Sequence, residues 1–414
     1  MATHIAPAHY PLPPEIAAFA GEINDIDGHE ALPVGAWVDA FGPVITPLRD
    51  ACVVVNAHHR GDTADSAEAH SVPPAPADDA EINGHNVWHL KDVAAPGSMD
   101  MERRLDVLDF VGTKRQILYP GGGPVFAHAL LNKADDPSVF KSITGDRARL
   151  AVEMIDSCNQ WAARLSRAQD RLRPAAILVG ETPDDLHDRL KGLIDGGVRQ
   201  VMISPDTPPG GVSPADPVLD RTWALAADAD CAILAHIAVS ENFPKTLVWR
   251  EAPAFKGWML GAEFSLDPWT LSNIHLAVQN YVMTMVMGGV FERHPRLRFG
   301  TAEFTGHWIG PLADNMDRWY ANTPFVADRG DLGLKLKPSE YVARNIRVAC
   351  FDFEPVGQYI DHFGLEDVYC YASDYPHHEG GKRPIERFLA SLSGKSDALL
   401  RKFFVTNGAW LLPD

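Results

Sequence analysis

The sequence predicts a single (β/α)8 barrel, and three observations support this fold class. Short runs rich in aliphatic and β-branched residues recur eight times, helical patterns fall between most of them, and 414 residues suffice for one large domain. Strands that alternate with helices favour a parallel sheet, because parallel neighbours need a crossover connection. Eight such units favour closure into a barrel over an open sheet. We therefore expect one barrel domain spanning residues 1–414.

The predicted strands are short, largely apolar runs, and all but one end at glycine, proline or a polar side chain. They cover residues 23–29, 116–120, 175–180, 200–205, 232–236, 297–303, 346–351 and 368–374. The last of them is typical, because a buried apolar run is followed by Asp374 and then by Pro376, which stops further pairing.

The predicted helices have apolar residues three or four positions apart, with charged residues between them. They cover residues 101–111, 148–169, 184–194, 217–229, 271–291, 307–320, 354–363 and 385–392. The helix over 184–194 has clear boundaries, because Thr182 and Pro183 supply an N-cap and a first turn, and Gly196 and Gly197 follow its end.

Residues 57–95 depart from this pattern and predict a long, loop-rich and partly mobile insertion after the first strand. The segment is poor in core-forming residues and rich in proline, alanine and aspartate. Its histidines are more simply explained as solvated loop residues than as metal ligands; they are His58, His59, His70, His85 and His89. A loop on the rim of an active site could still shape substrate access.

The composition excludes several classes of protein. A net charge of −18 without a Lys/Arg-rich run argues against binding to nucleic acid or to an anionic membrane. The longest apolar stretch, residues 277–291, is too short and too polar to span a bilayer. The first seven residues lack the features of a signal peptide, and the five cysteines form no CxxC pair. We therefore expect a cytoplasmic protein.

Potential metal ligands follow four of the predicted strands. They are Asp27 and His29 after the first strand, His236 at the fifth, Glu303 and His307 after the sixth, and Asp374 and His377 after the eighth. In a closed barrel these strand ends meet at one face. Residues two apart on a strand point the same way, so Asp27 and His29 can share one ion. Imidazole and carboxylate groups together suit zinc, manganese or iron, and we expect one divalent ion with room for a second.

Each of these side chains also has a simpler structural explanation. His29 or His236 could be a hydrogen-bonded core residue, Glu303 could form a buried ion pair, and Asp374 could cap a turn. The combination favours a metal site, because independent structural accidents should not fall on the same end of four strands. Residues 119–123, a glycine-rich run after the second strand, lack a GK[ST] or GxGxxG motif and predict a turn that brings backbone close to the substrate pocket.

Several motifs between about Asp25 and the C-terminus point to a known family. They are Asp27-Gly28-His29, residues 104–109, residues 159–161, His236, residues 289–295, residues 303–308 and Ser373-Asp374-Tyr375-Pro376-His377. With these motifs the chain resembles the amidohydrolase-related family that includes aminocarboxymuconate-semialdehyde decarboxylase, γ-resorcylate decarboxylase and many metal-dependent hydrolases. The last two motifs are specific in combination.

The resemblance implies that His29, His236 and Asp374 are metal ligands. Asp27 stands where many members have the first histidine of an HxH pair and should still bind metal. Glu303 stands where the decarboxylases have a catalytic histidine. His307 is a second departure, because relatives with this glutamate usually have a small residue at that position. It would either form a local hydrogen bond or, as an added ligand with Glu303 and His377, support a second ion.

We therefore expect a metal-dependent hydrolase or non-oxidative decarboxylase that acts on a small carboxylate or carbonyl compound. Asp374 would bind the metal or accept a proton, Glu303 would act as acid, base or ligand, and His307 is a further candidate. The alternatives are a dinuclear iron or iron–manganese oxygenase that hydroxylates a small organic acid, and a non-catalytic partner subunit. The apolar helix over 271–291 suggests a homo-oligomer or assembly with a related subunit.

Overall fold

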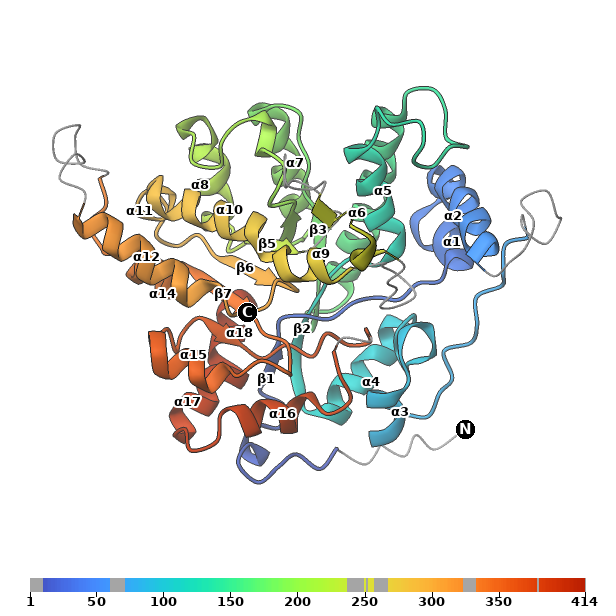
Figure 1. Ribbon diagram of the computed structural model, residues 1–414. Coiled ribbons are helices and arrows are strands. Elements are labelled where there is room, and N and C mark those ends of the chain that lie inside the picture. Colours follow the sequence, from blue (N-terminus) through green and yellow to red (C-terminus); the bar gives the residue numbers. More distant parts are fainter. Residues whose placement is uncertain are drawn as a thin grey trace.

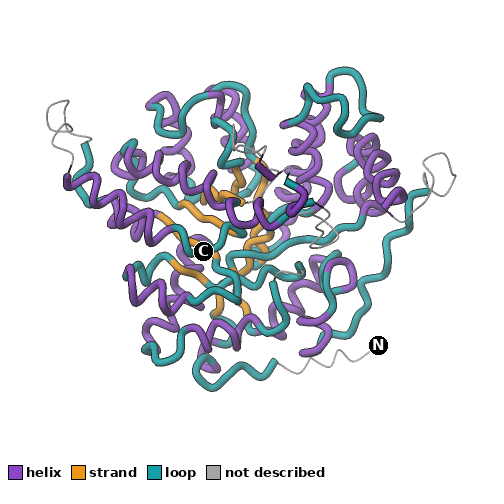
Figure 2. The backbone as a smooth tube through the Cα atoms, viewed as in Figure 1, coloured by secondary structure: helices purple, strands orange, loops and turns teal. Residues whose placement is uncertain are grey.

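Eight parallel strands, arranged in chain order, form the centre of the molecule. The computed structural model describes residues 10–59, 71–236, 249–250, 252–256, 267–322, 333–377 and 380–413. In Figures 1 and 2 the helices surround the strands, as in a (β/α)8 barrel. The predicted fold class is therefore confirmed. No helix among the described residues combines the length and the apolar character needed to cross a membrane.

All eight predicted strands are present, although most are shorter than predicted. They are β1 (Ile23–Asp25), β2 (Thr113–Leu118), β3 (Leu172–Ile177), β4 (Gln200–Ile203), β5 (Ala232–His236), β6 (Phe299–Ala302), β7 (Ile346–Ala349) and β8 (Tyr369–Cys370). The barrel closes beyond the ends of β1 and β8, where the Asp374 N–H donates to the Asp27 carbonyl at 3.0 Å and the His29 N–H donates to the Tyr375 carbonyl at 2.9 Å. This seam lies within the predicted metal-binding segments.

The helices confirm the predicted ones and add others. They are α1 (Trp37–Phe41), α2 (Thr46–His59), α3 (Gly84–His89), α4 (Met101–Val111), α5 (Gly122–Asn132), α6 (Arg147–Ala168), α7 (Pro183–Asp195), α8 (Asp220–Asp228), α9 (Pro268–Asn273), α10 (His275–Met287), α11 (Val290–Arg293), α12 (Ile309–Asn322), α14 (Pro338–Asn345), α15 (Val356–Phe363), α16 (Pro384–Ser391), α17 (Asp397–Arg401) and α18 (Asn407–Leu411). The predicted helix over 271–291 is divided into α9, α10 and α11. Gly289, with a φ of 72°, separates the last two.

Small apolar side chains fill the barrel interior. Ala175, Ala232, Ala302 and Ala349 are buried in one cluster with Leu411 of the C-terminal helix α18. The Gln200 side chain donates to the Leu411 carbonyl at 3.2 Å. Because Gln200 begins β4, α18 covers the amino-terminal end of the barrel, and the opposite end remains available for polar groups.

Within the predicted insertion over 57–95, residues 71–95 are described, and part of them is more ordered than the composition indicates. Val87 and Trp88 of α3 are buried in the main core, so the prediction of a loop-rich surface segment is wrong for this part. The Asp78 carboxylate accepts hydrogen bonds from the backbone N–H groups of Gly97, Met99 and Asp100, which fixes the segment against the start of α4. Two buried apolar side chains and one carboxylate that accepts three backbone hydrogen bonds thus hold this part of the segment in place.

The structure describes two of the five histidines of this segment in full, His85 and His89. His85 and His89 are exposed, and their rings stack with centroids 4.3 Å apart. Neither belongs to a metal-binding group. The side chains of His58 and His59, and all of His70, lie outside the described residues.

A buried amide joins α6 to the barrel. The Asn159 side chain donates to the Ile177 carbonyl at 2.8 Å and accepts from the Ile177 N–H at 2.9 Å. It therefore satisfies both backbone groups of the last residue of β3, where the strand ladder ends.

We predict that Asn159→Ala lowers the free energy of unfolding by about 1 to 3 kcal/mol, because two buried backbone groups lose their partner. Urea unfolding followed by circular dichroism measures the change. Gln160→Ala is the matched control, since Gln160 is exposed on the same helix. Equal effects of the two substitutions would contradict the prediction.

Candidate metal centre

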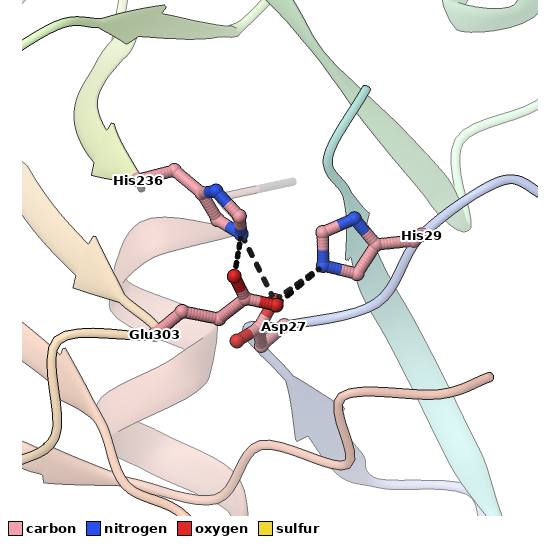
Figure 3. A group of neighbouring side chains, drawn as sticks. All are labelled: Asp27, His29, His236 and Glu303. Carbon is pink, nitrogen blue, oxygen red and sulfur yellow. Dashed lines mark ion pairs between the residues drawn. The ribbon is translucent and has the colours of Figure 1, made fainter. Parts of the chain in front are cut away.

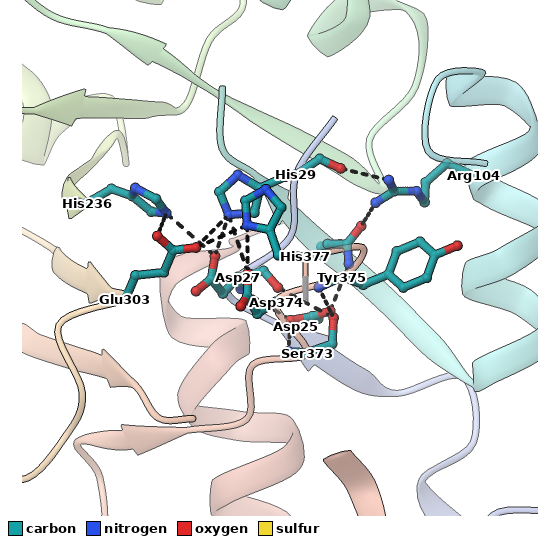
Figure 4. A network of polar contacts seen from close by, with 11 residues as sticks. Asp25, Asp27, His29, Arg104, His236, Glu303, Ser373, Asp374, Tyr375 and His377 are labelled. Carbon is teal, nitrogen blue, oxygen red and sulfur yellow. Dashed lines mark hydrogen bonds and ion pairs between the residues drawn. The ribbon is translucent and has the colours of Figure 1, made fainter. Parts of the chain in front are cut away.

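Six of the seven predicted site residues converge at the carboxyl ends of the strands (Figures 3 and 4). His236 is the last residue of β5, and the others follow β1, β6 and β8. All six side chains are buried; they are Asp27, His29, His236, Glu303, Asp374 and His377. The barrel therefore brings together groups that are separated by up to 350 positions in the chain, 27 to 377.

The Glu303 carboxylate lies at the centre of this cluster. Its Oε1 is 3.3 Å from His29 Nε2 and 3.2 Å from His377 Nδ1. Its Oε2 is 3.4 Å from His236 Nε2 (Figure 3). The two oxygens thus face different imidazoles, so this carboxylate could bridge two positions in the cluster.

Both aspartates have a carboxylate oxygen close to His29 Nε2. Asp27 Oδ1 is 3.4 Å from His29 Nε2, and Asp374 Oδ1 is 3.7 Å from the same atom. Asp374 Oδ1 is also 3.1 Å from His377 Nδ1. The rings of His29 and His377 stack with centroids 3.8 Å apart. These contacts place three carboxylates and three imidazoles within one small volume.

The donor atoms fit a metal ion. Asp27, His29, His236 and Glu303 form one group, and a second group shares two of these residues; it comprises His29, Glu303, Asp374 and His377. Within each group the potential ligand atoms lie within 4.8 Å of one another. Asp27 Oδ1 and Asp374 Oδ2 are buried and meet no hydrogen-bond donor in the described part of the chain. Carboxylate and imidazole ligands suit zinc, manganese and iron, so a divalent cation would satisfy these oxygens.

The electrostatics of the cluster also favour a cation. Burial, and then the Glu303 carboxylate, raise the pKa of Asp27 and of Asp374 well above the usual range. Burial acts in the same direction on Glu303, but the charge of His236 and hydrogen bonds from the other two imidazoles outweigh it and hold the pKa of Glu303 well below its ordinary value. The negative charge of Glu303 is therefore balanced by the imidazoles, whereas the charges of Asp27 and Asp374 are not fully balanced. A divalent ion would supply the missing positive charge.

The backbone is strained at two of these residues. Glu303 has a φ of 60° and Asp374 a φ of 51°, in the left-handed region that non-glycine residues rarely adopt. Such a conformation costs on the order of 1 kcal/mol or more for each residue and is typical of functional sites. The strained conformations occur where the chain leaves β6 and β8 and turns a carboxylate into the cluster.

His307 lies apart from the cluster. Its side chain is exposed, its Nδ1 is 2.5 Å from Thr305 Oγ1, and its ring contacts that of His275 with centroids 4.6 Å apart. It belongs to neither metal-binding group. The structure thus does not support the prediction of His307 as a ligand or catalytic residue, and it matches the simpler expectation of a local hydrogen bond.

A cavity of about 330 Å³ opens beside the cluster. His29, His236 and Glu303 lie on one side, and Trp37 and Phe126 lie among the apolar residues that line the remainder. Gly121 and Gly122 also line the cavity, as expected for the glycine-rich run over 119–123, but the predicted turn is shorter because α5 begins at Gly122. A cavity with one polar side and aromatic walls suits a small compound with a single anionic or carbonyl group.

The insertion holds the segment that carries Asp374 and His377. The Asp92 N–H donates to the Pro376 carbonyl at 3.2 Å, and Lys91 Nζ donates to the Gly381 carbonyl at 2.5 Å. Asp92 also lines the cavity. The insertion therefore contributes to the pocket wall and contacts the metal-binding segment.

Sequence reasoning missed the polar groups beneath the cluster. Asp25, Arg104 and Gln116 are buried and linked by hydrogen bonds, yet none had been assigned a role in the site. The sequence does offer a signal for Asp25 and Gln116, because each is a polar side chain within a predicted or observed buried strand and therefore needs a hydrogen-bond partner.

Comparisons with known proteins agree with this architecture. A sequence profile of the amidohydrolase family matches residues 140–413. A comparison with curated proteins gave no match. The structure of an amidohydrolase from Mycobacterium avium subsp. paratuberculosis K-10 superposes with a TM-score of 0.65 at 17% identity, covering 95% of this chain and 99% of that one.

Two decarboxylase structures are also similar. 5-Carboxyvanillate decarboxylase from Sphingomonas paucimobilis gives a TM-score of 0.56 at 16% identity, covering 94% of this chain and 99% of that one. The enzyme of the same name from Novosphingobium aromaticivorans, complexed with manganese and 4-hydroxy-3-methoxy-5-nitrobenzoic acid, gives 0.52 at 16% identity, covering 94% and 96%. At these identities the likeness shows a shared fold.

We predict that Asp374→Asn stabilises the metal-free protein and that the gain increases with pH. A raised pKa means that native Asp374 holds its proton more tightly than the unfolded chain does, so its favourable contribution is complete at acid pH and is lost as pH rises through the native pKa. Asparagine has no charge to lose. The gain should be small near pH 4 and on the order of 1 kcal/mol or more at pH 8.

Urea unfolding of chelator-treated protein between pH 4 and 8 measures this difference. Asp39→Asn, a change at an exposed carboxylate, is the control. A gain that is constant with pH, or that is largest in acid, would show that the buried charge of Asp374 does not destabilise the metal-free protein.

Proposed function

This chain belongs to the amidohydrolase family, and from that premise we propose that it is a metal-dependent hydrolase or non-oxidative decarboxylase of a small carboxylate or carbonyl compound. The family match confirms the predicted family and agrees with an enzyme of the hydrolase or lyase type. The observation that carries the proposal is the convergence of six buried carboxylate and imidazole side chains beside a cavity.

We propose that Asp27, His29, His236 and Glu303 hold a divalent transition metal. They form the group that combines donors following β1 and β6 with His236 of β5, and three of its members line the cavity. Manganese is our first choice, because the similar decarboxylase from Novosphingobium aromaticivorans was solved with it. Asp374 and His377, with the shared His29 and Glu303, would complete a second position if two ions bind.

A bound divalent ion would act as a Lewis acid on a substrate oxygen. The protein's own groups would supply orientation and a proton. Trp37 and Phe126 would pack against the apolar part of the substrate and exclude water from the cavity. Asp374 is the proposed proton carrier, because its carboxylate lies buried in the cluster with an oxygen that meets no hydrogen-bond donor in the described part of the chain, and burial favours its protonated form.

The two reactions would use that proton differently. In decarboxylation the bond between carbon and the carboxyl group breaks, carbon dioxide leaves, and a proton from Asp374 takes its place on the carbon. In hydrolysis Asp374 would instead accept a proton from the attacking water. Glu303, whose pKa is lowered, would stay ionised throughout and bind or orient.

The alternative functions lose their support. The oxygenase interpretation depended on His307 as an added ligand, and His307 lies outside both metal-binding groups. The family match and the decarboxylase neighbours give it no support either. A non-catalytic subunit would have little reason to retain buried carboxylates without hydrogen-bond donors.

We also propose a cytoplasmic homo-oligomer, or an assembly with a related subunit. All five cysteines are free and buried, which is consistent with a reducing compartment. Leu271 of α9 and Met283 of α10 are exposed, at 41% and 37%, and they are candidates for a contact between subunits. Light scattering that gives the mass of a monomer would remove this proposal.

We predict that protein purified without added metal contains at least one divalent ion per chain and releases carbon dioxide, or hydrolyses its substrate, without consuming oxygen. A panel of small aromatic acids that includes 5-carboxyvanillate is the first assay. Dialysis against a chelator should abolish turnover, and Mn²⁺ should restore it. Elemental analysis and manometry measure these quantities.

We expect the His236→Ala variant to lose the bound ion and to turn over substrate more slowly by a factor of about 100 or more, because one of the four proposed metal ligands is removed. His307→Ala is the matched control and should retain both, since its ring lies outside the cluster. Turnover that persists after complete removal of metal, or that requires oxygen, would refute the proposed function.

A further inference from the structure

A fully buried arginine lies beside the cluster (Figure 4). Arg104 of α4 has no exposed surface and donates three hydrogen bonds to groups on other segments. Its Nε donates to the Gly97 carbonyl at 2.6 Å, its Nη1 to Gln116 Oε1 at 2.8 Å, and its Nη2 to the His29 carbonyl at 2.7 Å. The guanidinium also lies over the Tyr375 ring, 4.8 Å from its centroid.

The hydrogen bonds continue from Arg104 to the opposite side of the seam. Gln116 Nε2 donates to Asp25 Oδ2 at 2.8 Å. The Asp25 carboxylate also accepts from Ser373 Oγ at 2.6 Å, from the Ser373 N–H at 3.0 Å and from the Asp27 N–H at 3.2 Å. A chain of side chains, Arg104–Gln116–Asp25–Ser373, therefore crosses from α4 through β2 and β1 to the segment after β8.

Three members of this chain bind the backbone of a candidate metal ligand or directly precede one in the sequence. Arg104 binds the carbonyl of His29, Asp25 binds the N–H of Asp27, and Ser373 directly precedes Asp374. None of these contacts involves a donor atom of the cluster. The network can therefore position the ligands without occupying any of their coordinating atoms.

The Gln116 side chain packs closely against the backbone of Gly28. A Cβ added to Gly28, between Asp27 and His29, would lie 2.5 Å from the Gln116 side chain. The backbone that carries the first two ligands thus rests directly on this amide. A buried guanidinium and a buried carboxylate are expensive to desolvate, and replacing such groups with apolar residues is often neutral or stabilising. We explain the presence of these buried charged groups by their effect on geometry, because they hold the backbone of the metal ligands in place.

We propose that Arg104, together with Gln116 and Asp25, is a positioning group that fixes the metal ligands Asp27, His29 and Asp374 across the β1–β8 seam. This inference rests on the proposed function, because it assumes that the cluster holds a metal. The fork of the guanidinium is essential to the role, since it binds the His29 carbonyl and the Gln116 amide at the same time.

Arg104→Lys tests the proposal, because lysine keeps the charge and loses the fork. We expect the dissociation constant for Mn²⁺, measured on the full chain by competition with a chelating dye, to rise by a factor of about 10 to 100. The visible spectrum of the Co²⁺-substituted variant should also change, since it reports ligand geometry. A purely structural arginine would alter neither quantity in the folded protein.

Arg147→Lys is the matched control. Arg147 is also buried and donates to the carbonyls of Asp136 and Val139, away from the cluster. We expect it to lower the midpoint of thermal unfolding and to leave the Mn²⁺ dissociation constant and the Co²⁺ spectrum unchanged.

A smaller change covers the case in which Arg104→Lys does not fold. Ser373→Ala removes only the hydroxyl that donates to Asp25, and we expect Mn²⁺ binding to weaken several-fold. Ser157→Ala, which removes a hydroxyl that donates to the Phe41 carbonyl, is its control and should bind Mn²⁺ like the wild type.

The outcomes separate the two proposals. Wild-type protein that binds no Mn²⁺, Zn²⁺ or Fe²⁺ would overturn the proposed function and this inference with it. Wild-type protein that binds Mn²⁺, together with unchanged affinity and an unchanged Co²⁺ spectrum in both Arg104→Lys and Ser373→Ala, would overturn the positioning role alone.

Discussion

The burial of three carboxylates among three imidazoles is the constraint on which the rest of the structure depends. Removing these groups from water without neutralising them would be unfavourable, and Asp27 and Asp374 have oxygens without a hydrogen-bond donor in the described part of the chain. Glu303, held between imidazoles from β1, β5 and the β8 segment, links the two halves of the cluster. A divalent cation resolves the imbalance, which is why we assign the cluster to metal binding before any particular reaction.

The fold supports this unfavourable arrangement at the seam of the barrel. The two sides of the seam are joined by backbone hydrogen bonds just beyond β1 and β8, at and next to the metal-binding segments, and Glu303 and Asp374 adopt left-handed conformations. Arg104 and its partners join the two sides, and Asp92 of the insertion holds the segment after β8. The residues that close the barrel at this seam are thus the same residues that supply ligands to the site.

Much of this could be predicted from sequence, and the exceptions have physical causes. The strands and six site residues follow from one regularity, that polar groups at the carboxyl ends of parallel strands meet. His307 satisfies the same rule in one dimension, but the left-handed turns at Glu303 and Thr305 direct the chain so that its ring reaches solvent. The burial of Arg104 could not be predicted, because an arginine on a helix has the sequence pattern of a surface residue. The order of the described part of the insertion could not be predicted either, because Asp78 fixes it through hydrogen bonds.

The most direct test of the central claim is an anomalous difference map from crystals of protein loaded with Mn²⁺. We predict a peak within coordination distance of Asp27, His29, His236 and Glu303, at the cavity side of the cluster, and the map would show directly whether Asp374 and His377 bind a second ion. Crystals that contain Mn²⁺ elsewhere but show no peak among these side chains would contradict the account.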